Sequence, residues 1–126
     1  MDPQVRLRLA REQLAKVQVA WLDPVDWSDL TIYGMHACEN AVVAAAEALD
    51  ISVKRTHWDK VDVADRLHNG HKLPDIAALL RELNELRKGF AYGEMTIDPT
   101  MSAEDIAGGV EHYLDAVSDL LERVQT

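Results

Sequence analysis

A guanidinium, an amide and a phenol fall close together late in the sequence. Asn84, Arg87 and Lys88 are followed by Gly89 and Tyr92. An arginine beside an aromatic hydroxyl suits a phosphate or a nucleobase. Arg87 and Tyr92 are five residues apart, which separates them by about 140° around an ideal helix. They therefore meet in one pocket only if the helix loosens between them, which Gly89 permits.

The same spacing leaves a second interpretation open. Arg87 can instead pair with an acidic neighbour while Tyr92 packs at the helix end, and the spacing favours neither arrangement. If the pocket forms, Arg87 and Tyr92 are the candidate catalytic pair. The candidate ligand-binding residues, with two on an earlier segment as the opposite wall, are Asn84, Arg87, Lys88, Tyr33 and His36.

The histidines do not have the spacing of a metal site. They are His36, His57, His68, His71 and His112. A di-metal helical bundle needs a Glu-x-x-His turn from each of two helices. The chain has His36-x-x-Glu39 in the reverse order and Asp65-x-x-His68 with a shorter carboxylate. We interpret these histidines as surface groups near helix ends, and we predict no metal and no cofactor.

Two carboxylate pairs and one thiol complete the set of chemically competent groups. Glu82-x-x-Glu85 and Glu47-x-x-Asp50 resemble the pairs of magnesium-dependent all-α nucleotide pyrophosphatases, but in the opposite chain order. The first pair also lies among basic residues, which is typical of a salt-bridged exposed face. Cys38 lies in an apolar helical pattern, which indicates a core thiol rather than a nucleophile.

Helices must position these side chains, because four long segments and one shorter segment repeat apolar residues at steps of three and four. The expected helices run from Asp2-Pro3 to near Asp23-Pro24, from Asp26 or Ser28 to about Leu49, from Thr56 to Asn69-Gly70, from Pro74 to Gly89 or Gly93, and from Ser102 onward. No alternating segment is long enough for a strand. The pattern predicts an all-α, five-helix up-and-down bundle over residues 1–126, with the Ala-rich second helix at its centre.

Two of these helices have well-defined apolar stripes. In the fourth helix the predicted buried face consists of Ile76, Leu79, Leu80, Leu83, Leu86 and Phe90. In the fifth helix it consists of Ile106, Val110, Tyr113, Val117, Leu120 and Val124. Stripes of this kind face the core of a bundle.

Composition restricts the class of protein. The chain has 126 residues, 48% of them apolar, and its 22 acidic and 13 basic side chains give a net charge of −9. This composition argues against disorder and against a large basic nucleic-acid surface, although a small basic patch can remain. A single cysteine fits a reducing cytosol, and no run of about 18 apolar residues predicts a membrane span. We expect a cytoplasmic, single-domain protein.

The order of several segments resembles a HEPN domain, the small all-α module of prokaryotic RNA-cleaving toxins and nucleotide-binding proteins. The likeness covers most of the chain. It includes Asp26-Trp27-Ser28 before the helix with Tyr33 and Ala48, Thr56-His57 at the next helix, Leu83-Asn84-Glu85-Leu86-Arg87 with Ala91-Tyr92-Gly93 behind it, and a long amphipathic C-terminal helix. The resemblance implies a homodimer that acts on RNA or a nucleotide, with a cognate antitoxin or a nucleotidyltransferase-type protein as a further partner.

The chain departs from the ribonuclease members at one position. Those members carry Arg, four residues and His, and the family mechanism implies that this pair from two subunits meets at a dimer interface and cleaves RNA without metal, through the 2′-hydroxyl. Here the matching histidine is Tyr92. Histidine titrates near 6.5 and tyrosine near 10, and loss of a general acid or base costs about 10²–10⁴ in rate. We therefore predict binding of RNA or a nucleotide with weak or absent cleavage.

Two other functions remain open. A literal Arg-x4-His occurs at Arg66 and His71, but at the end of the third expected helix, and we treat it as coincidence. The first alternative is an active metal-independent endoribonuclease or toxin that uses His57, His68 or His71 in place of the missing histidine. The second is a structural helical module for protein interaction, in which Arg87 is salt-bridged and no ligand binds.

Overall fold

The computed structural model describes residues 2–91, 93 and 99–125, and every regular element within them is a helix. The helices are α1 (Pro3–Ala20), α2 (Trp27–Ala48), α3 (His57–His71), α4 (Ala77–Ala91) and α5 (Ala103–Gln125). The all-α prediction is confirmed for this part of the chain. Among these helices, none combines the length and apolar character needed to cross a bilayer.

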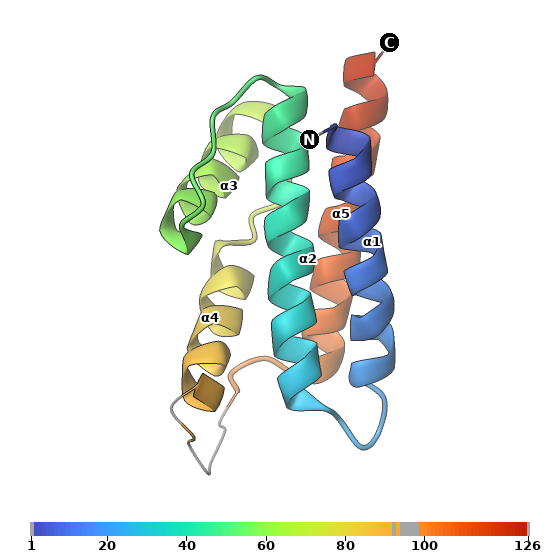
Figure 1. The fold of residues 1–126 in the computed structure, drawn as a ribbon, viewed down its shortest axis with the longest axis vertical. Helices are drawn as coiled ribbons and strands as arrows, with labels where there is room; N and C mark the ends of the chain where they lie inside the picture. Colours follow the sequence, from blue (N-terminus) through green and yellow to red (C-terminus); the bar gives the residue numbers. More distant parts are fainter. Residues whose placement is uncertain (1, 92, 94–98, 126) are drawn as a thin grey trace.

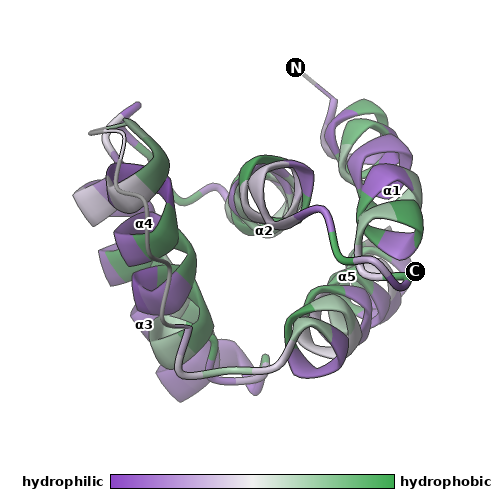
Figure 2. Cartoon of the chain, turned by 90° about the horizontal axis from the view of Figure 1, so that it is seen from below, coloured by the Kyte–Doolittle hydropathy of each residue, from purple (hydrophilic) through white to green (hydrophobic). Residues whose placement is uncertain are grey.

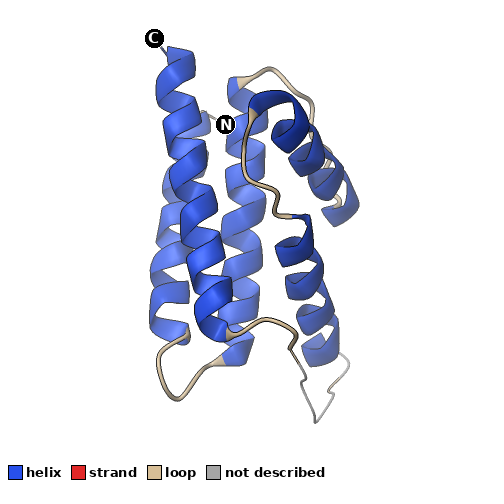
Figure 3. Cartoon of the chain, turned by 180° about the vertical axis from the view of Figure 1, so that it is seen from behind, coloured by secondary structure: helices blue, strands red, loops and turns tan. Residues whose placement is uncertain are grey.

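The directions of the helices differ in one respect from a simple up-and-down bundle. Helices α1, α2, α4 and α5 alternate in direction, whereas α3 runs the same way as α2 (Figure 1). A return segment between α2 and α3 makes this possible. Helices α3 and α4 then lie one after the other along α2 (Figures 1 and 3). The two shorter helices therefore share one side of the bundle, and their first turns lie near each other.

Helix α2 is the centre of the bundle, as its sequence predicts. It contacts each of the other four helices, with α1 and α5 on one side and α3 and α4 on the other (Figure 2). Its alanines at 37, 41, 44, 45 and 46 are all fully buried. Small side chains on several faces allow neighbouring helices to approach closely, which explains why this segment takes the middle position.

Four helices begin where the sequence predicts, because a polar side chain caps each first turn. A side-chain oxygen of the capping residue accepts a hydrogen bond from a backbone N–H two or three residues later. The pairs are Asp2 with Gln4 at 2.8 Å, Asp26 with Asp29 at 3.0 Å, Thr56 with Asp59 at 3.2 Å and Ser102 with Asp105 at 3.0 Å. Local capping chemistry thus sets these boundaries.

The prediction that Pro74 opens the fourth helix is wrong by three residues. Helix α4 begins at Ala77, whose N–H donates to the Asp75 carboxylate at 3.0 Å. The carbonyl of Ile76 accepts the first helical hydrogen bond, from Leu80 at 2.9 Å. Asp75 therefore caps the helix, and Pro74 stays in the connecting segment.

The end of the third helix also differs from the prediction. Gly70 remains helical, and α3 continues to His71. Lys72 takes the left-handed conformation, with a φ of 61°. His68 donates from Nδ1 to the carbonyl of Leu73 at 2.7 Å, which holds the chain against the last turn. This contact beyond the helix explains why the helix does not end at the glycine.

Both predicted stripes are buried except at their last residues. Phe90 is only half-buried, and Val124 is 45% exposed. In the last turns of α5 the core position is taken instead by Leu121, which is 1% exposed.

Replacing Gly108 in α5 by alanine is expected to stabilise the protein. No atom lies within 4 Å of a Cβ added there, and glycine inside a helix is less favourable than alanine by about 0.5–1 kcal/mol. Urea denaturation should show a gain of this size in the free energy of unfolding. Gly109→Ala is the control, since its Cβ would lie 3.2 Å from Leu79 Cδ2 and should gain less. A destabilised Gly108→Ala would contradict this account of α5.

Candidate functional site

Arg87 projects from α4 and is held by a neighbouring amide. Its Nη2 donates to Asn84 Oδ1 at 3.0 Å, and Asn84 is only 4% exposed. The structure thus brings together two of the predicted ligand-binding residues. Among the residues that the structure describes, no carboxylate lies within ion-pair distance of Arg87. Lys88 differs, because its Nζ lies 3.5 Å from Glu85 Oε1 on the exposed surface. Arg87 is therefore oriented without being neutralised by an ion pair in this part of the chain.

A cluster of charged groups lies where α2 meets the first turn of α3. Glu39 of α2 presents one oxygen, Oε1, to Lys60 Nζ at 3.3 Å and to His57 Nδ1 at 3.9 Å. The three side chains are 13%, 21% and 14% exposed, respectively. The first turn of α3 lies beside the middle of α2 and near the start of α4 (Figure 1). This cluster therefore joins α2 to the first turn of α3.

The charge of Arg87 acts on this cluster. Burial of the His57 ring is the main reason that its pKa is lowered from 6.5. Glu39 opposes this effect, whereas Arg87, Lys60 and Lys88 each lower the pKa further. Both ring nitrogens are shielded from solvent and have no hydrogen-bond partner among the described residues. Burial therefore favours the neutral form of the His57 imidazole, and the charge of Arg87 disfavours its protonation further.

Acidification is expected to destabilise the protein through His57. In the unfolded chain its pKa is about 6.5, so between the lowered folded pKa and that value the unfolded chain binds more protons. The stabilisation is complete above about pH 6.5 and is lost as the pH falls through the folded pKa. His57→Gln should reduce the difference in unfolding free energy between about pH 7.5 and pH 5.

His112→Gln is the matched control for this pH dependence, because His112 is exposed on α5. It should keep the decline of the unmodified protein. An equal decline in all three proteins would show that His57 does not couple to folding.

An exposed indole and several further cations lie next to His57. Trp58 is 63% exposed, and its ring meets the His57 ring edge-on, with centroids 5.6 Å apart and an interplanar angle of 67°. Lys54 and Arg55, both exposed, precede them in the segment that enters α3. We call Lys54, Arg55, Lys60, Arg87 and Lys88 the basic face.

The basic face reverses the charge balance of the chain. Of its five cations, Lys60 pairs with Glu39 and Lys88 pairs with Glu85. The other three, Lys54, Arg55 and Arg87, have no carboxylate within ion-pair distance among the described residues. The chain as a whole has 22 acidic and 13 basic side chains. An anionic ligand is therefore favoured here over most of the remaining surface.

The two residues predicted for the opposite wall, Tyr33 and His36, both belong to α2. Tyr33 is seven residues before Asn40, so both lie on nearly the same side of the helix. The Asn40 amide donates to Gln13 of α1 at 2.8 Å, and α1 and α4 lie on opposite sides of α2 (Figure 2). Tyr33 thus faces the α1 side, away from Arg87. His36 is exposed, one turn before Glu39.

Tyr92, the second half of the predicted catalytic pair, lies outside the described residues. Helix α4 stays regular through a buried Gly89 to Ala91, so the loosening that a glycine permits does not occur within these residues. The left-handed conformation occurs instead at Gly93, with a φ of 69° and its N–H donating to the Phe90 carbonyl at 3.2 Å.

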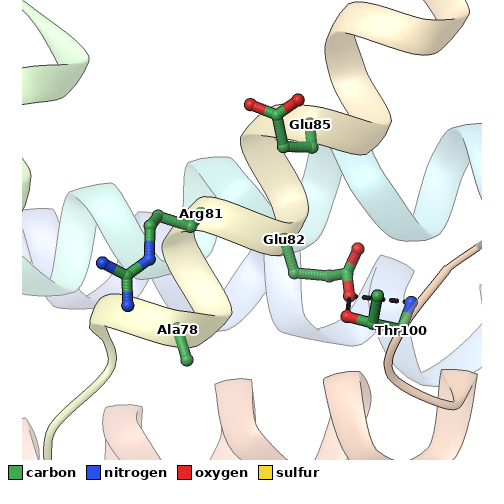
Figure 4. Close-up of a pocket in the computed structure, with 5 residues that line it drawn as sticks. All are labelled: Ala78, Arg81, Glu82, Glu85 and Thr100. Atoms are coloured by element: carbon green, nitrogen blue, oxygen red, sulfur yellow. Dashed lines mark hydrogen bonds between the residues drawn. The ribbon is translucent and has the colours of Figure 1, made fainter.

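The candidate carboxylate pairs are engaged in other contacts. Glu82 accepts hydrogen bonds from the backbone and hydroxyl of Thr100, and the Glu82 and Glu85 carboxylates point apart (Figure 4). They line a hollow of about 380 Å³ with Ala78, Arg81 and Thr100. Glu47 contacts Arg6 of α1 at 3.2 Å. Within the described ranges, no group of three or more His, Cys, Asp or Glu could hold a metal ion.

The structure also describes the thiol of Cys38 and the literal Arg-x4-His motif at Arg66 and His71. Burial, with a smaller effect of Glu39, raises the pKa of the Cys38 thiol to about 12, which keeps it protonated in the core. This confirms its interpretation as a core residue. Arg66 and His71 are exposed near the end of α3, and neither is part of the cluster around His57.

Sequence reasoning missed Glu39, Lys60 and Trp58. Glu39 lies in a stretch of α2 whose neighbours Cys38 and Ala41 are fully buried, and a carboxylate in such a stretch indicates a partner on another helix. The site is thus defined by its own chemistry: an amide-held guanidinium, a neutral histidine and an exposed indole on a basic face. Comparison of the chain with protein-family models, with curated proteins and with solved structures finds no match.

Proposed function

We propose that this chain is a HEPN-like domain that binds the phosphate of single-stranded RNA or a nucleotide at Arg87, with weak or absent cleavage. The observation that carries the proposal is the guanidinium itself. It is held at 3.0 Å by the buried Asn84 amide and has no carboxylate within ion-pair distance among the described residues. A fixed, planar cation of this kind is suited to bidentate contact with phosphate oxygens.

The position of His57 favours binding over catalysis. A general base must reach the proton that it removes, within about 3 Å or through one water. Both nitrogens of the His57 ring are shielded from solvent. In this arrangement the imidazole does not reach a 2′-hydroxyl of a bound chain, although Arg87 is near enough for its charge to act on the ring.

The proposal is tested by titrating a labelled single-stranded oligonucleotide with the protein at low and moderate salt. We expect binding that weakens as salt rises, because phosphate neutralisation releases counterions. Glu39→Gln should tighten binding a few-fold, since it removes a negative charge beside the basic face. Glu122→Gln, at an exposed position on α5, is the control and should leave affinity unchanged. No binding at low salt, or equal effects of the two substitutions, would contradict the proposal.

A second candidate function is a metal-independent endoribonuclease, in which the His57 ring would have to turn so that one of its nitrogens reaches RNA held at Arg87. It predicts RNA cleavage in the presence of EDTA that is lost in His57→Ala and retained in His68→Ala and His71→Ala. Growth arrest on expression, relieved only by His57→Ala, would support a toxin. Absence of cleavage by the unmodified protein would exclude this function and leave binding.

We also propose a homodimer, on the basis of the outer face of α1. Val5, Leu9 and Val19 are 38%, 37% and 71% exposed and recur on one side of the helix. Glu12 and Lys16 lie between them, so an antiparallel second copy would place each Glu12 opposite the partner's Lys16. Sedimentation should show a dimer that dissociates in Val19→Glu. A monomer at micromolar concentration would contradict this arrangement, and a dimer without any nucleotide binding would favour the structural module.

A further inference from the structure

We propose that the indole of Trp58 is a stacking platform for a nucleobase, so that the basic face selects single-stranded chains with an accessible base over free phosphate. The inference rests on the proposed phosphate contact at Arg87 and adds the second half of the ligand. It concerns a residue that the Arg87 contact does not require. Its failure can therefore be distinguished from failure of phosphate binding.

The exposure of Trp58 is unusual within this chain. Trp21 and Trp27 are partly buried and pack against the core, whereas Trp58 is 63% exposed. A tryptophan side chain can bury more apolar area than most others, so an indole left in solvent contributes little of this burial to the stability of the fold. An exposed indole beside cations is instead the arrangement found in proteins that bind single strands.

Trp58 is also held in place. It is the second residue of α3, directly after the capped first position, where the Thr56 hydroxyl accepts from the Asp59 N–H at 3.2 Å. The half-buried His57 ring contacts it edge-on, with centroids 5.6 Å apart. This contact engages the two rings at 67° rather than face to face, so His57 does not stack on the indole. A base can therefore stack on a ring whose position is already fixed.

Cations lie on the chain before and after the indole. Lys54 and Arg55 precede it in a segment that is fastened to α3, because the Lys54 N–H donates to the Asp59 carboxylate. Lys60 and Arg87 lie toward α2 and α4, near His57. A nucleotide chain carries a phosphate on each side of every base, so this distribution matches a stacked base with its flanking phosphates.

The geometry has a consequence for selectivity. A base inside a duplex already stacks on its neighbours and presents only its edges, whereas a base in a single strand offers its face. Aromatic stacking accepts every base, so little sequence preference is expected. Duplex RNA should therefore bind more weakly than a single strand of the same length. Inorganic phosphate should bind more weakly than a single strand that carries the same charge.

The test compares Trp58→Ala, Trp58→Phe and the control Val124→Ala, an exposed apolar residue on α5. With a short labelled single-stranded RNA, Trp58→Ala should lose about 5- to 100-fold in affinity, the range for removal of a base-stacking aromatic. Trp58→Phe should keep most of the affinity, and Val124→Ala all of it. Added oligonucleotide should quench the tryptophan fluorescence of the unmodified protein and should have little effect on Trp58→Phe.

Two results would overturn the inference in different ways. If Arg87→Ala weakens binding while Trp58→Ala binds like the unmodified protein, the phosphate site stands and base stacking is wrong. If single-stranded RNA, duplex RNA and inorganic phosphate all fail to bind the unmodified protein, both proposals are wrong. Equal binding of duplex and single strand would also contradict stacking on Trp58.

Discussion

Leu83→Ala is expected to lower the free energy of unfolding by about 2–5 kcal/mol. Leu83 is fully buried in α4. Its two Cδ atoms lie 3.5 and 3.8 Å from the point where a Cβ on Gly34 of α2 would stand, so the side chain fills the space above that glycine. Removal of its methyl groups leaves a cavity that the close α2–α4 contact cannot easily close. Urea denaturation, followed by circular dichroism, measures the change.

Leu22→Ala is the matched control for this substitution. Leu22 lies in the segment between α1 and α2 and is 52% exposed, so the same chemical change should cost less than about 1 kcal/mol. If the two substitutions cost the same, α4 does not pack on α2 through Leu83, and the position of Arg87 relative to α2 and α3 would also be wrong.

Arg87→Ala is expected to weaken binding of a single-stranded oligonucleotide by about 10- to 100-fold. A hydrogen bond to a charged group contributes about 1.5–3 kcal/mol, and each 1.4 kcal/mol is tenfold in affinity. The affinity of Arg87→Lys should lie between those of the unmodified protein and Arg87→Ala, because lysine keeps the charge and loses the planar pair of donors. Fluorescence anisotropy at low salt measures all three proteins.

Arg81→Ala is the control for Arg87→Ala, since it removes the same side chain from the same helix. Arg81 is exposed and extends beside Ala78, where it lines the hollow with Glu82 and Glu85 (Figure 4). It should change affinity by no more than about 2-fold. Thermal unfolding should show that Arg87→Ala remains folded, because the lost hydrogen bond to Asn84 contributes about 1.5–3 kcal/mol, less than the total stability of about 5–15 kcal/mol that is usual for a domain. Equal losses in Arg81→Ala and Arg87→Ala would indicate a non-specific charge effect.

The helix boundaries that the sequence predicts are those set by neighbouring residues. Asp26 and Ser102 cap the turn that directly follows them, so a short window of sequence contains the whole interaction. The start of α4 is harder to predict from the sequence, because Pro74 and Asp75 are both residues that commonly begin a helix. The end of α3 depends on a bond from His68 to Leu73 across a segment whose path the sequence does not indicate.

The contacts of the candidate site also divide into local ones, which the sequence suggests, and contacts between helices, which it does not. The contact between Asn84 and Arg87 is local, three residues apart on one helix, and the sequence suggests it. The contact of Glu39 with Lys60 joins residues 21 apart, on helices whose relative direction the sequence does not give. Because α3 runs parallel to α2, its first turn returns to the middle of α2, and this places His57 within the influence of Arg87. The direction of α3 is thus what the periodicity of the sequence leaves undetermined.

The most direct test of a phosphate-binding basic face is two-dimensional amide NMR during titration with a short single-stranded RNA. We predict that chemical-shift changes concentrate in residues 54–60 and 84–88, from two helices that are separate in sequence. Amides on the outer face of α1 and in the second half of α5 should remain unchanged at the same RNA concentration. Changes confined to α1 or α5, or none in 54–60 and 84–88 at saturating RNA, would contradict the account.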